Sequence, residues 1–107
     1  MDTAALISDM LAAALGAAKG HANDLKDYLE ARARLIAEGI VAIEADRSAG
    51  DITDDDARFA YGEIRASEET ALLAVEATLT AAAQDAINAA LDVAASAFNA
   101  AVGIAVL

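Results

Sequence analysis

Apolar residues in the first 47 positions of this 107-residue chain recur with the period of an α-helix. Ten steps of the pattern cover 36 residues, a mean of 3.6 residues per step. A β-strand would alternate apolar and polar residues at every second position, and no segment does so. The stripe consists of Ile7, Leu11, Ala14, Ala18, Ala22, Leu25, Leu29, Ala33, Ile36, Ile40 and Ile43. The pattern predicts one helix over about residues 3–47.

The continuity of this first helix depends on two glycines. The stripe keeps its phase through Gly16 and Gly20, and the chain contains no proline, the strongest helix breaker. Both facts favour one unbroken helix. In the alternative, Gly20 ends one helix, and Asn23 and Asp24 open the next.

The end of the first helix and the start of the second are marked more clearly. Gly50 lies where a glycine commonly ends a helix, shortly after the cation Arg47. Thr53 can cap the following helix, and Asp56 can reach back to the backbone N–H of Thr53. We therefore expect a turn over residues 48–53. Helical spacing of apolar residues then predicts a second helix over about residues 54–104.

Two helices joined by so short a turn must lie antiparallel, so the sequence predicts an all-α fold: one long helical hairpin forming a single domain over residues 1–107. Each helix would be ~68–75 Å long at 1.5 Å per residue. Facing residues would have numbers that sum to about 102. This register pairs Arg32 with Glu69, Arg34 with Glu68, Lys26 with Glu76, Glu44 with Arg58, Glu38 with Arg65, Lys19 with Asp85, and Arg47 with Asp54 or Asp55.

The same register brings small residues together. Gly16 would face Ala86, and Gly20 would face Ala82. Small side chains on both helices let the two backbones approach closely. A leucine at Gly16 is therefore expected to force the helices apart.

Charge is distributed unevenly along the chain. Residues 24–76 hold 20 of the 25 charged side chains, so the end of the hairpin that carries both termini is apolar on nearly every side. Such a surface exceeds what a monomer usually exposes and predicts a partner. We expect a second copy, giving a four-helix bundle or a larger helical oligomer. The expected interface consists of Leu6, Met10, Leu15, Ile87, Leu91, Phe98, Val102 and Ile104.

Three polar residues are candidates for a polar or ion-binding site. Asp9 and Asp92 face each other in the predicted register within apolar surroundings, where at least one carboxyl pKa would be raised. The alternative that both lie on the outer face in water is preferred. His21 is the only histidine and lies near Asp24, but metal-binding helical bundles use a Glu-x-x-His pair that is absent here. An ordinary surface histidine is the simpler interpretation.

Composition excludes several classes of function. There is no cysteine, hence no disulfide or thiol chemistry, and the net charge of −11 opposes binding to nucleic acid. No signal peptide or membrane-spanning segment is recognisable, which predicts a cytoplasmic protein, with membrane association as the alternative. No catalytic motif, cofactor motif or metal-ligand spacing is present, so we expect neither an enzyme nor a cofactor. The many alanines and the preference for arginine over lysine suggest a GC-rich bacterial genome.

The sequence therefore predicts a non-enzymatic structural or assembly protein that associates with itself through its apolar end. A protein that engages lipid or a membrane surface is the first alternative, suggested by the uncharged segment 93–107. The second is a carrier or storage bundle enclosing a ligand or metal near Asp9, Asp92 and His21.

Overall fold

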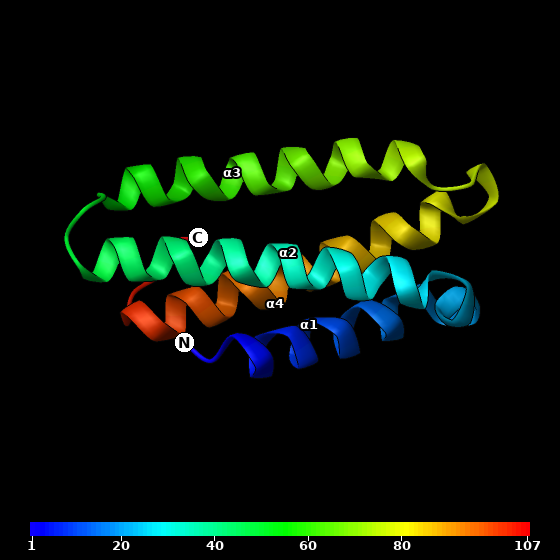
Figure 1. Ribbon diagram of the computed structural model, residues 1–107, viewed down its shortest axis with the longest axis horizontal. Coiled ribbons are helices and arrows are strands. Elements are labelled where there is room, and N and C mark those ends of the chain that lie inside the picture. The colour runs from blue at the N-terminus through cyan, green and yellow to red at the C-terminus, as the bar shows by residue number, and fades with distance from the viewer.

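The computed structural model describes residues 1–107 and consists of helices and turns without strands, which confirms the all-α prediction (Figure 1). The α-helices are α1 (Thr3–Ala18), α2 (Ala22–Ser48), α3 (Asp54–Ala71) and α4 (Thr80–Val102). Three short 3-10 segments join them: η1 (Lys19–His21), η2 (Leu72–Ala74) and η3 (Ala77–Leu79). None of the helices combines the length and the apolar character needed to cross a membrane.

The predicted first helix is not continuous but breaks between α1 and α2. Lys19 adopts φ 52° and ψ −123°, a conformation that non-glycine residues rarely take, and the chain reverses there (Figure 1). The break lies beside Gly20, as the alternative interpretation has it, although the glycine itself does not have a positive φ. Reversal lets the apolar stripe of α1 pack against α2 and α4 within one chain.

The predicted second helix also breaks, at a place the sequence does not mark. Between α3 and α4 the chain runs through η2 and η3, with Val75 and Glu76 extended at ψ 139° and 138°. No glycine or proline lies in this segment. The turn is therefore favoured by the burial that it allows, because it carries α4 back beneath α2 and alongside α1 (Figure 1). The molecule is 43 Å long, well short of the hairpin that the sequence predicts.

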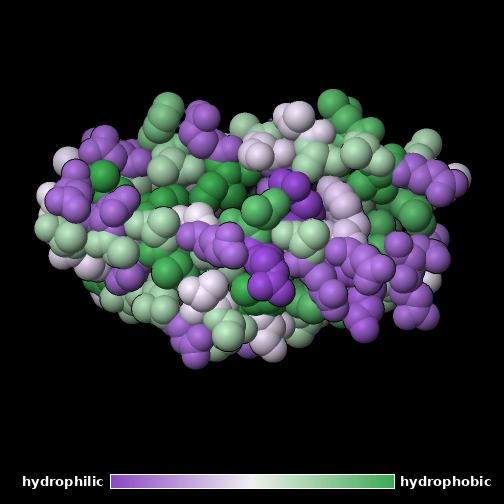
Figure 2. Space-filling view, in the orientation of Figure 1, coloured by the Kyte–Doolittle hydropathy of each residue, from purple (hydrophilic) through white to green (hydrophobic).

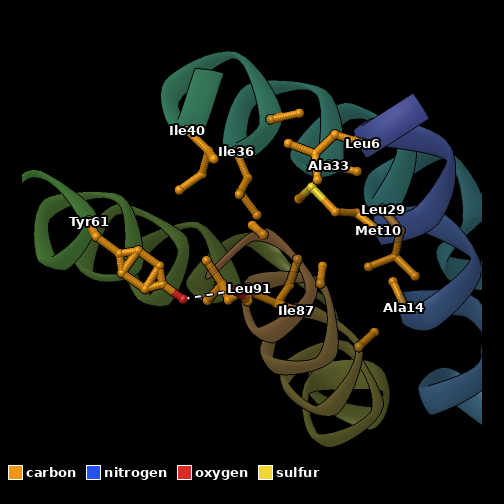
Figure 3. Packing of buried hydrophobic residues seen from close by; sticks show 14 of the residues in the cluster. Leu6, Met10, Ala14, Leu29, Ala33, Ile36, Ile40, Tyr61, Ile87 and Leu91 are labelled. Atoms are coloured by element: carbon orange, nitrogen blue, oxygen red, sulfur yellow. Dashed lines mark hydrogen bonds between the residues drawn. The ribbon is translucent and has the colours of Figure 1, made fainter. Parts of the chain in front are cut away.

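The core is built mainly by α1, α2 and α4. Large side chains such as Met10, Leu29, Ile36 and Phe98 are fully enclosed, and Figure 3 shows several of the core residues pointing toward one another from these helices. Alanines fill the remaining helix contacts and let the backbones approach closely. The buried alanines of these three helices are Ala14, Ala18, Ala33, Ala37, Ala83, Ala86, Ala90 and Ala94.

Helix α3 is held less completely than the other three. Only Ala57, Tyr61 and Glu68 of its 18 residues are buried, and it packs mainly on α2. Its start is well defined, because the Thr53 hydroxyl accepts from Asp56 N–H while the Asp56 carboxylate accepts from Thr53 N–H. The predicted cap and turn are thus confirmed, and α3 forms an outer layer over α2.

The last residues fold back onto the helices. Gly103 ends α4 in the left-handed conformation at φ 81°. The Asn99 side-chain oxygen then accepts from the backbone N–H groups of Val106 (2.9 Å) and Leu107 (2.8 Å). Val106 is buried, and Arg58 of α3 reaches its carbonyl oxygen at 3.5 Å. This segment therefore links α4 to the first turns of α3.

Candidate functional site: the groove between α2 and α3

A groove of about 290 Å³ runs between α2 and α3. Its apolar lining comes from Leu35 and Ile36 on α2 and from Ile64 on α3. Gly39 lets the helices approach here, because a Cβ at this position would lie only 2.9 Å from Ile64 Cδ1. The polar lining consists of Arg32, Glu63, Ser67 and Glu68.

One ion pair forms part of the groove lining and joins α2 to α3. Arg32 donates from Nε to Glu68 Oε1 (2.7 Å) and from Nη2 to Oε2 (2.5 Å), a bidentate arrangement. The Glu68 side chain is 3% exposed and that of Arg32 is 20% exposed. The hydrogen bonds to Glu68 raise the pKa of the Arg32 guanidinium, against the opposing effect of burial. Both carboxylate oxygens of Glu68 are thus occupied in holding α3 onto α2.

Tyr28 lies one helical turn before Arg32 and has a buried hydroxyl with no hydrogen-bond partner. Burial raises the pKa of this phenol; the charge of Arg32 lowers it and that of Glu68 adds to the rise. A buried hydroxyl without a partner costs free energy, so Tyr28 contributes through the packing of its ring rather than through its oxygen.

Tyr61 makes the second polar connection of α3 to the core. Its hydroxyl donates to the Leu91 carbonyl of α4 at 2.9 Å (Figure 3). Arg65 lies one turn further along α3, with its guanidinium carbon 5.8 Å from the centre of the Tyr61 ring and one nitrogen 3.4 Å from the hydroxyl. The ring is therefore fixed between two helices and covered by a cation.

The predicted oligomer interface lies mostly inside the chain. Leu6, Met10, Ile87, Leu91 and Phe98 are buried in the core, and Leu15 and Val102 are half-buried. Ile104 alone among the eight is exposed. The two charge-poor segments do lie side by side, as α1 and α4, but α2 covers them from the same chain. The prediction that this end needs a second copy to cover it was therefore wrong.

The predicted close packing at two glycines is also absent. Gly16 and Gly20 are exposed, and a Cβ at either would meet nothing within 4 Å. Ala86 is buried and Ala82 is half-buried. The two alanines are therefore packed inside the protein as predicted, whereas the two glycines are not. Both glycines therefore lie on the surface, and a side chain added at Gly16 would begin in open space.

The three candidate polar residues do not form a site. Asp9 and Asp92 are both exposed, in agreement with the preferred interpretation. Asp9 borders a shallow hollow between the start of α1 and the end of α4. His21 Nδ1 lies 3.9 Å from the Asp24 carboxylate, and both side chains are largely in water. Nowhere do three His, Asp or Glu side chains gather in a way that could hold a metal ion.

Of the predicted charge pairs, only the one nearest the turn forms. Arg47 pairs with Asp54 at 2.9 Å, and Arg32 pairs with Glu68 rather than with Glu69. The other five predicted pairs do not form. The breaks at η1 and at η2–η3 remove the helix pairing on which Lys19–Asp85 and Lys26–Glu76 depended. The other unformed pairs lie between α2 and α3, where Glu68 pairs with Arg32 and Arg58 pairs with Asp55 instead.

The buried Glu68 is the site residue that sequence reasoning missed. A signal exists, because Ala57, Tyr61, Ile64 and Glu68 are spaced as one inward helix face, and a carboxylate on such a face needs a partner.

Comparisons with protein-family models, with curated proteins and with solved structures found no match to this chain.

Proposed function

We propose that this protein is a non-enzymatic structural protein that acts by assembling with copies of itself. The observation that carries the proposal is the position of its most exposed large hydrophobic side chains. Phe59 is 73% exposed and Leu73 is 85% exposed, and they lie on α3 and directly after it. Leu35, also exposed, lines the groove beside the same helix. Exposed apolar side chains on and beside one helix favour a protein contact there.

The polar groups of α3 support a structural role. Arg32 and Glu68 neutralise each other, Arg47 neutralises Asp54, and the Tyr61 hydroxyl is satisfied by a backbone carbonyl. These interactions hold α3 in place, and no other helix of the chain packs on its outer face. A face positioned in this way suits packing against another helix better than it suits chemistry.

The net charge of −11 limits how copies could associate. Equal negative charges repel, so the attraction between copies would have to come from apolar contact, and salt would strengthen it by screening the repulsion. Assembly through the α3 side would place helices of two copies together, giving the larger helical bundle that the sequence suggests.

Light scattering coupled to size exclusion, without detergent, tests the proposal. We expect a mass that is a multiple of the 10.8 kDa chain and that returns to the single-chain value in mild detergent. A single-chain mass at every protein concentration would overturn it. Association that occurs only with lipid vesicles, followed by flotation, would instead support a lipid-surface protein.

A further inference from the structure

Helix α3 lies outside a core that the other three α-helices form together. Four residues of α1, seven of α2 and seven of α4 are buried, against three of the 18 residues of α3. In Figure 1, α3 runs along one edge of the molecule, beside α2. Most of the apolar burial that stabilises the fold therefore lies among α1, α2 and α4.

Few contacts hold α3 on this core. The Glu68 carboxylate is bound by Arg32 of α2, and the Tyr61 hydroxyl donates to the Leu91 carbonyl of α4. Leu72, directly after α3, is buried as well. The groove of about 290 Å³ leaves part of the α2–α3 boundary without close packing, and Figure 2 shows hydrophobic side chains at the surface along it. The attachment of α3 thus depends on a small number of side chains.

The connections at both ends of α3 allow it to move without unwinding its neighbours. The turn before it contains Gly50 at φ 78°, and Arg47 holds Asp54 beside that turn. After it, Val75 and Glu76 are extended at ψ 139° and 138°. Neither connection is α-helical, so α3 can leave the core while α2 and α4 keep their own helical hydrogen bonds.

We propose that α3 is a hinged cover, which opens from an intact core of α1, α2 and α4 at a lower free energy than the unfolding of the whole chain. Proteins open in cooperative units, and the units with the fewest buried apolar contacts open most readily. Opening uncovers the side of α2 that carries Ile36 and Gly39, together with the Leu91 carbonyl of α4. This device does not depend on the proposed self-assembly.

Hydrogen exchange, followed by mass spectrometry of peptide fragments, tests the proposal in the wild-type chain. An 18-residue helix released from its neighbours is only marginally stable, so the amides of α3 exchange whenever it opens. We expect fragments from α3 to exchange at least about tenfold faster than the slowest fragments of α2 and α4.

Two variants of similar cost separate opening from global unfolding. Tyr61→Phe removes a hydrogen bond that is broken both in the open state and in the unfolded chain. It should therefore speed exchange about fivefold in α3 and in the slowest fragments of α2 and α4. Ala14 is buried in α1, which stays folded in the open state. Ala14→Gly should speed the slowest fragments of α2 and α4 about fivefold and leave those of α3 unchanged.

The response of α3 to Ala14→Gly decides the outcome. If its fragments also exchange about fivefold faster in that variant, α3 is lost only when the whole chain unfolds, and the proposal is overturned. Wild-type fragments of α3 that exchange as slowly as those of α2 and α4 would overturn it equally.

Discussion

Glu68, the one buried carboxylate of the molecule, is neutralised by Arg32 from the neighbouring helix through two parallel hydrogen bonds. Arg32 is more exposed to water than Glu68, so replacing one or the other should lower the stability by different amounts. Arg32→Met leaves a buried carboxylate alone and should lower the free energy of unfolding by about 3 kcal/mol. Glu68→Gln should cost about 1–2 kcal/mol, because Arg32 can still reach solvent and the amide still accepts a hydrogen bond. Urea denaturation measures both.

The single variant Glu68→Leu and the double variant Arg32→Met, Glu68→Leu form a double-mutant cycle with Arg32→Met. Replacing a buried ion pair by apolar side chains is often neutral, so the stability of the double variant should lie close to that of the wild type. Additive losses from the two single changes would show that the pair is not coupled as the structure indicates.

Stability should fall in acid partly through Asp56. Hydrogen bonds from the Thr53 backbone and hydroxyl hold the pKa of this carboxyl below its usual value. A pKa lowered in the folded state gives stability that is present above the unfolded pKa and is lost as the pH falls below about 4. Asp56→Asn should flatten the decline of the melting temperature between pH 5 and pH 2, measured by circular dichroism. Asp46→Asn, an exposed carboxylate that caps no helix, should leave the decline unchanged.

Two tyrosines should respond oppositely to loss of their hydroxyl groups. Tyr61→Phe removes the hydrogen bond to Leu91 and should cost about 1 kcal/mol. Tyr28→Phe removes a buried hydroxyl that has no partner and should be neutral or stabilising by up to about 1 kcal/mol. Thermal denaturation of the pair is the test, and a larger loss for Tyr28→Phe would contradict the structure.

Alanine substitutions at two helical glycines should likewise have different effects on stability. Gly16→Ala has open space and should stabilise α1 by about 0.5–1 kcal/mol through helix propensity. Gly39→Ala gains the same propensity but meets Ile64 at 2.9 Å, so its net effect should be smaller or destabilising. Equal stabilisation at both positions, in chemical denaturation, would mean that α3 does not approach α2 as closely as described.

The helical class and the central turn could be predicted from sequence because local chemistry determines them. The apolar period identified the chain as helical, and Thr53 with Asp56 located the start of α3. The two further chain reversals depend on tertiary packing. Lys19, rather than Gly20, takes the unusual conformation at the first reversal. At the second, residues 72–79 contain no glycine or proline, so burial of α4 decides the turn.

The candidate site was mispredicted for the same reason. An unbroken hairpin leaves Leu6, Ile87 and Phe98 without enough cover, whereas a chain that folds back twice more buries them itself. The most exposed large hydrophobic side chains are instead Phe59 and Leu73, and their exposure is visible only once the position of α3 is known. The apolar period of a sequence does not by itself distinguish an outer helix from a central one.

Sedimentation equilibrium over a range of protein concentrations tests self-assembly through α3 most directly. Wild-type protein should rise from the 10.8 kDa chain mass toward twice that value, more readily at higher salt. The Phe59→Ser, Leu73→Ser double variant should remain at the single-chain mass, while Ile104→Ser, an exposed change elsewhere, should associate like the wild type. Wild-type protein that stays at 10.8 kDa throughout, or a double variant that dimerises equally well, would contradict the account.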